Sequence, residues 1–106
     1  MTWYKVLKDG VMKDGDLFKA SVDSKEVLII KSKENYYATS SYCTHEDYDL
    51  SEGFMDEGKL ICPNHFATFE PKDGSVVSPP EGSGSISPLK SYKTKVENGE
   101  VMVDLQ

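Results

Sequence analysis

Two short segments, Cys43-Thr44-His45 and Cys62-Pro63-Asn64-His65, contain every cysteine and every histidine of the chain. Each segment pairs one thiol with one imidazole. Side chains two residues apart point the same way in an extended backbone, and a tight turn brings Cys62 and His65 together in a similar way. Thiolates and imidazoles are the ligands that zinc, iron and copper prefer in proteins. The pattern therefore predicts a metal site assembled from two loops.

The order of the ligands separates two kinds of site. A single tetrahedral zinc ion could take all four residues, but zinc fingers usually group cysteine with cysteine and histidine with histidine. Here each pair is mixed. That order suits a two-iron cluster in which one iron takes a cysteine from each loop and the other takes a histidine from each loop. A structural zinc module remains the alternative at this stage.

The rest of the chain predicts an all-β protein. Short segments rich in β-branched and aromatic residues alternate with turn residues, and evidence for helices is thin. The clearest signal is Asn98-Gly99 between two alternating segments, which predicts a type I′ hairpin. Several short strands with frequent turns indicate an antiparallel sandwich or small barrel. The predicted strands cover residues 3–7, 16–22, 27–31, 36–40, 59–62, 68–70, 75–77, 92–96 and 101–105.

With Cys-Thr-His and Cys-Pro-x-His in place, the chain resembles a small soluble Rieske-type [2Fe–2S] ferredoxin of an archaeon or bacterium. The resemblance implies a Rieske-like antiparallel fold in which two hairpin loops hold the cluster. It assigns Cys43 and Cys62 to the inner iron and His45 and His65 to the outer one. It also implies a single domain over residues 1–106, with cluster-binding loops at about 42–50 and 61–70 and a proline loop at about 78–85.

Departures from the membrane-bound members of the family are informative. Those proteins have an extra cysteine in each loop, and the two form a disulfide; Tyr48 and Asn64 occupy the corresponding positions here. They also have a serine and a tyrosine that donate hydrogen bonds to the cluster and to a cysteine sulfur, where this chain has Ala67 and Phe69. The sequence thus resembles the disulfide-free ferredoxins that serve ring-hydroxylating oxygenases. The expected potential is near the low end of the roughly −150 to +300 mV Rieske range.

Charge is concentrated where the Cys/His pairs lie. Residues 43–70 contain seven of the eighteen acidic residues and one of the twelve basic residues, so this segment alone carries the net charge of −6. Such an acidic surface argues against nucleic-acid binding and favours weak, transient docking to a basic patch on a redox partner. The plainer interpretation is that the acidic residues only keep the protein in solution.

Length and composition complete the expectation. A chain of 106 residues forms one domain with a modest core. It shows neither a signal peptide nor a membrane-spanning run, so we expect a cytoplasmic monomer with reduced thiols. Both histidines are assigned to iron and no nucleophilic triad is evident, so we expect an electron carrier and not an enzyme. A permanently bound Rieske subunit of a larger redox enzyme is the other possibility.

Overall fold

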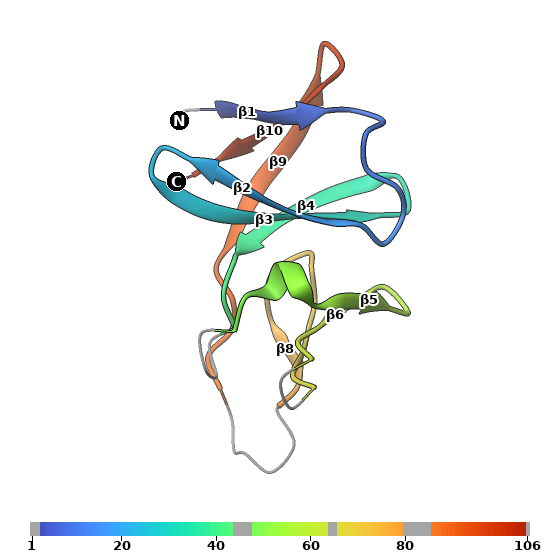
Figure 1. The fold of residues 1–106 in the computed structure, drawn as a ribbon, viewed down its shortest axis with the longest axis vertical. Helices are drawn as coiled ribbons and strands as arrows, with labels where there is room; N and C mark the ends of the chain where they lie inside the picture. The colour runs from blue at the N-terminus through green and yellow to red at the C-terminus, as the bar shows by residue number, and fades with distance from the viewer. Residues whose placement is uncertain (1–2, 44–47, 64–65, 80–85, 106) are drawn as a thin grey trace.

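The computed structural model describes residues 3–43, 48–63, 66–79 and 86–105. Within these ranges, ten strands form two antiparallel sheets, which lie one above the other in Figure 1. The only helical element among the described residues is the short 3₁₀ helix η1, Leu50–Glu52, and none of them forms a helix that could span a membrane. The all-β prediction is therefore confirmed.

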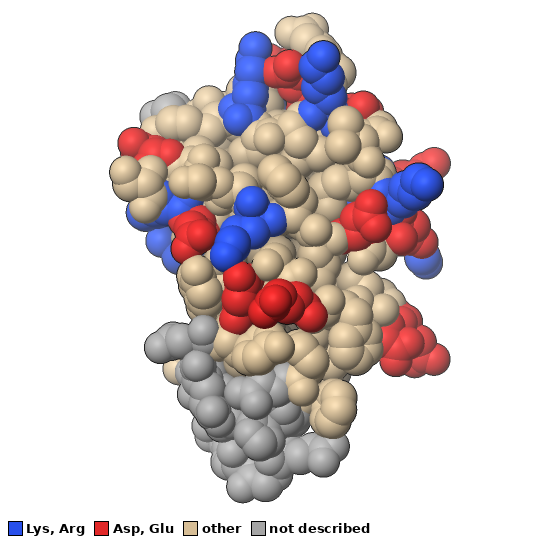
Figure 2. Space-filling view, in the orientation of Figure 1, with Lys and Arg blue, Asp and Glu red and all other residues tan. Residues whose placement is uncertain are grey.

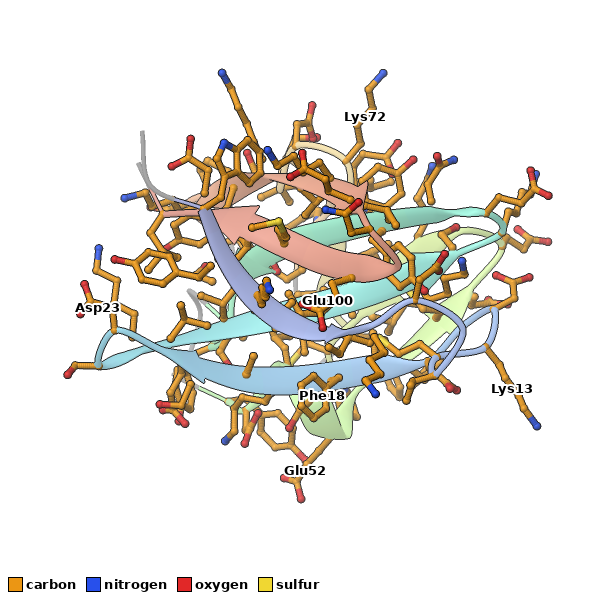
Figure 3. The ribbon with its side chains drawn as sticks, turned by 90° about the horizontal axis from the view of Figure 1, so that it is seen from above. Lys13, Phe18, Asp23, Glu52, Lys72 and Glu100 are labelled. Atoms are coloured by element: carbon orange, nitrogen blue, oxygen red, sulfur yellow. The ribbon has the colours of Figure 1, made fainter. Side chains whose placement is uncertain are left out.

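The larger sheet has six strands in the order β1-β10-β9-β4-β3-β2. Its two edge strands, β1 and β2, approach each other, so the sheet is nearly closed into a barrel (Figure 3). The bounds are β1 Trp3–Lys8, β2 Leu17–Val22, β3 Lys25–Ser32, β4 Asn35–Ser40, β9 Ser91–Glu97 and β10 Glu100–Asp104.

The smaller sheet has four strands in the order β5-β6-β7-β8. It is an insertion between β4 and β9, and the chain returns from it to the larger sheet through Leu89 and Lys90. The bounds are β5 Phe54–Asp56, β6 Lys59–Ile61, β7 Thr68–Phe69 and β8 Val76–Ser78. The sequence did not predict β5, nor the turn of helix before it.

Strand β3 explains why the two sheets hold together. Its residues Val27, Leu28, Ile29 and Ile30 are all fully buried. Val27 and Ile29 belong to the core inside the larger sheet, whereas Leu28 and Ile30 belong to a second core shared with the smaller sheet. Alternate side chains of a strand point to opposite faces, so an uninterrupted apolar run is what a strand covered on both faces requires.

The predicted β9–β10 hairpin is confirmed. Glu97 pairs with Glu100, and the two residues between them, Asn98 and Gly99, both have positive φ angles of 53° and 76°. A type I′ turn needs this backbone conformation at both central positions.

Gly74 lies directly against the chain that returns from the smaller sheet to the larger one, next to Leu89. Its φ is +77°, and a Cβ atom at this position would overlap the backbone of Leu89. The Leu89 N–H donates to the Gly74 carbonyl at 2.8 Å, and the Gly74 N–H donates to the Glu70 carbonyl at 2.7 Å. Only glycine combines this backbone angle with this proximity.

Substituting Gly74→Ala should therefore destabilise the fold more than Gly10→Ala does. Gly10 also has a positive φ, of +93°, but nothing lies within 4 Å of an added Cβ. We expect about 1 kcal/mol of loss at Gly10 from the left-handed backbone. At Gly74 we expect about 2 kcal/mol or more, because overpacking adds to that term. Thermal unfolding of both variants at one scan rate measures the difference; equal losses would show that the contact with Leu89 is not tight.

Candidate metal centre

The two cysteines occupy equivalent positions in two hairpins. Cys43 follows β4, and its backbone N–H donates to the Tyr48 carbonyl at 2.8 Å. Cys62 follows β6, and its N–H donates to the Ala67 carbonyl at 2.9 Å. In both hairpins the cysteine thus closes the loop by bonding to the fifth residue after it. The backbone at both cysteines therefore makes the same type of loop-closing hydrogen bond.

Further backbone pairing holds the base of each hairpin. In the first, Tyr42 and Asp49 form an isolated antiparallel bridge, and the Leu50 N–H donates to the Ser41 carbonyl at 2.9 Å. In the second, β6 and β7 pair Ile61 with Thr68. Fixed hairpin bases are what a site built on two loops needs, because the ligands must keep their places while the loops remain exposed to partners.

Both thiols are buried in the same apolar cluster. Cys43 is 1% exposed and Cys62 is 0% exposed, and neither forms a disulfide. This cluster is the second core described above. It consists of Leu28, Ile30, Cys43, Leu50, Leu60, Cys62, Ala67, Phe69 and Leu89. The fold therefore brings into one core two sulfur donors that are nineteen positions apart in the sequence.

The other two predicted ligands, His45 and His65, lie outside the described residues, as does most of the predicted proline loop at 78–85. Their roles stay predictions.

The donor set in the described part of the site fits an iron–sulfur cluster. Two cysteines from separate loops, neither in a disulfide, can supply the two thiolates that one iron of a mixed-ligand cluster requires. The Ser41 hydroxyl, two residues before Cys43, is buried and has no hydrogen-bond partner among the described residues. A buried donor without an acceptor is unusual, and it leaves a polar contact available on the strand that leads to Cys43.

Two aromatic residues of the second hairpin have opposite environments. Phe69 is fully buried in the cysteine-containing core. Phe66 is instead 53% exposed and has a φ of +59°. A bulky residue rarely adopts this left-handed backbone, and such strain tends to occur at functional sites.

One cluster of charged and aromatic side chains joins the first hairpin to the larger sheet. The Lys19 ammonium lies 2.6 Å from Asp49 and 3.5 Å from Glu26, and the Tyr42 hydroxyl donates to Glu26 at 2.6 Å. Asp49 also accepts hydrogen bonds from the Ser51 N–H and hydroxyl, at 3.0 and 2.7 Å, and so caps η1. The hydrogen bond from Lys19 is the main cause that lowers the pKa of Asp49, and the same bond raises the pKa of Lys19. Sequence reasoning did not find this cluster.

Comparison with known proteins places these features in context. Residues 2–93 match the family described as the Rieske [2Fe-2S] domain. The ferredoxin component of the naphthalene 1,2-dioxygenase system of Pseudomonas putida is 28% identical over 97% of this chain and 95% of its own length. The biphenyl dioxygenase ferredoxin subunit of Pseudomonas sp. (strain KKS102) is 32% identical over 98% of this chain and 93% of its own.

Solved structures agree with this result. A chain in the complex of reduced oxygenase and oxidised ferredoxin of carbazole 1,9a-dioxygenase superposes with a TM-score of 0.84 at 29% identity, covering 95% of this chain and all of that one. The carbazole 1,9a-dioxygenase ferredoxin of Nocardioides aromaticivorans IC177 gives a TM-score of 0.88 at 24% identity over the full length of both chains. The second match supports the fold alone.

Proposed function

This chain belongs to the family of Rieske [2Fe–2S] domains, and on that basis we propose that it is a ferredoxin, a one-electron carrier between a reductase and an acceptor such as an oxygenase. The observation that carries the proposal is the placement of two buried cysteines, neither in a disulfide, at equivalent positions of two hairpins. A carrier of this kind is not itself an enzyme. Its task is to hold the cluster, exclude water from its inner side and present the outer side to partners.

We assign four ligands to the [2Fe–2S] cluster, Cys43 and Cys62 on the inner iron and His45 and His65 on the outer iron. When bound, the cluster accepts and releases one electron. The burial of both cysteines supports the assignment of the inner pair. Residues 1–106 would then act as one domain, with the larger sheet as the base and the smaller sheet as the support of the second hairpin.

The apolar wall around the cysteines supports a low potential. Ala67 and Phe69 are both fully buried in the cysteine-containing core, and neither side chain carries a hydrogen-bond donor. Fewer donors toward the sulfur atoms stabilise the reduced, more negative state less. The excess of carboxylates in residues 43–70 also disfavours the extra electron and so lowers the reduction potential further.

We further propose that the acidic surface next to the first hairpin docks weakly onto a basic patch of each redox partner. Glu52, on η1, is exposed and points outward in Figure 3, and acidic side chains gather over η1 and at the β5–β6 turn in the lower half of Figure 2. Phe66 adds an exposed aromatic contact on the second hairpin. Small interfaces of mixed charge and apolar character suit brief electron-transfer encounters. We expect the protein to be a cytoplasmic monomer. In the reducing cytoplasm both thiols stay reduced until the cluster is inserted.

A redox titration of the purified protein tests the carrier proposal. We expect a reversible wave for one electron with a negative midpoint potential near neutral pH. A clearly positive midpoint would contradict the low-potential assignment, and the lack of any reversible wave in coloured protein would contradict the carrier function.

Adding a donor at residue 67 should raise this midpoint. Ala67→Ser places a hydroxyl in the cysteine-containing core, where it can stabilise the reduced cluster, so we expect an upward shift of some tens of millivolts. Ala38→Ser is the matched control, because Ala38 is equally buried but lies in the other core. Equal midpoints for the variant and the wild type, or equal shifts in both variants, would count against the role of residue 67.

Docking through acidic residues predicts a dependence on salt. Reduction of a basic probe protein such as cytochrome c should slow as ionic strength rises, since screening weakens electrostatic steering. Glu52→Gln should lower the rate at low salt about twofold or more, whereas Glu97→Gln, at the far hairpin between β9 and β10, should change it little. The same loss in both variants would indicate an effect of net charge and no defined docking surface.

A further inference from the structure

Loops that hold a cluster without a disulfide between them need another source of rigidity. This chain has only two cysteines, and they do not form a disulfide with each other. The hydrogen bonds at the base of the first hairpin fix its own two strands to each other, but they do not fix the hairpin to the larger sheet. Apolar packing of Cys43 and Leu50 in the core shared with β3 is one connection, and the polar contacts among Lys19, Glu26, Tyr42 and Asp49 add a second.

The four residues form a continuous set of contacts at the base of the hairpin. Tyr42 and Asp49 are bridge partners, one on each side of the stretch that begins with Cys43. Lys19, on β2, contacts both of them, with its ammonium 2.6 Å from Asp49 and 5.5 Å from the centre of the Tyr42 ring. Glu26, on β3, completes this set through Tyr42 and Lys19. Both sides of the hairpin are thereby tied to the same sheet.

The burial of Lys19 favours a structural contribution over a loose surface contact. Its side chain is 29% exposed and that of Asp49 is 25% exposed, so solvent screens their interaction less than that of fully exposed pairs. The two oxygens of Asp49 also have separate partners, Lys19 on one and Ser51 on the other, which fixes the orientation of the carboxylate. Replacing Lys19 would remove the cation that pairs with both Glu26 and Asp49.

We propose that Lys19 is a positioning residue that fixes the first cysteine-bearing hairpin on the larger sheet and thereby slows loss of the cluster. The inference rests on the proposed function, since it concerns retention of the [2Fe–2S] group. Residues that orient metal ligands without touching the metal commonly change metal affinity by about 10- to 100-fold when they are replaced.

Chelator-driven bleaching of the visible absorption tests this proposal on the intact holoprotein. Lys19→Met should lose its cluster about tenfold faster than the wild type. Lys19→Arg keeps the charge and the donors and should restore most of the native lifetime. Lys95→Met is the matched control, because Lys95 also pairs with a carboxylate, Glu97 at 3.3 Å, and lies over an aromatic ring, Trp3 at 4.4 Å. It removes the same charge from the same sheet, far from the hairpin, and should leave the lifetime unchanged.

EPR spectra of the reduced proteins provide a second readout. Lys19→Met should broaden or shift the signal of the cluster, whereas Lys95→Met should not, because only the first changes how a ligand-bearing hairpin is held. If Lys19→Met yields too little holoprotein, Glu26→Gln decides, since it weakens the contacts with Lys19 and Tyr42 and should shorten the lifetime to a smaller extent.

Three results separate the possible failures. Wild-type protein with no iron–sulfur absorption would overturn the proposed function itself. Wild-type protein with a cluster, and a native lifetime in both Lys19→Met and Glu26→Gln, would overturn only the role of Lys19. Equal acceleration in Lys19→Met and Lys95→Met would also overturn it, by showing a general effect of lost charge or stability.

Discussion

Burial of β3 on both faces couples the two sheets. Val27 and Ile29 fill the core of the larger sheet, while Leu28 and Ile30 pack in the cysteine-containing core. Fully burying one such aliphatic side chain contributes about 1.5–3 kcal/mol. The strands of the smaller sheet have only two or three residues each, and their buried side chains Leu60 and Phe69 pack in the same core as Leu28 and Ile30. A polar residue at any of the four β3 positions would weaken one of the two layers.

Packing against β3 positions the two cysteine-containing hairpins. Leu50, just after the first hairpin, and Leu60, just before the second, pack in the same core as the two thiols. A backbone hydrogen bond from each cysteine to the fifth residue after it then closes the base of each loop. Two apolar anchors and two matched bonds therefore bring together donors that are far apart in the sequence.

Much of the fold could be predicted from the sequence because its strands follow simple patterns. The predicted strand at 27–31 and the alternation around Asn98-Gly99 each correspond to an observed element. Strand β5 was missed because Phe54 and Asp56 are both exposed, and its three residues owe their conformation to pairing with β6. Phe66 is exposed on a left-handed backbone, and no sequence pattern signals that geometry.

The parts of the candidate site that lie in short sequence motifs could be predicted from the sequence. Residue type and spacing identify Cys43 and Cys62 as candidate ligands, and the structure places both in one buried apolar core. The pair formed by Lys19 and Asp49 joins residues thirty positions apart and uses two of the commonest surface residue types. Nothing local distinguishes them from solvated charges. Such contacts emerge only when the strands are placed in space.

Pulsed EPR of the reduced protein, prepared with ¹⁵N-labelled histidine, tests whether two histidines ligate the cluster. Mixed Cys/His ligation predicts couplings from two histidine nitrogens, which change with the isotope and disappear when His45 and His65 are both replaced. Coloured protein whose reduced signal shows no histidine coupling would contradict the mixed Cys/His ligation, and colourless protein that contains zinc would contradict the cluster altogether.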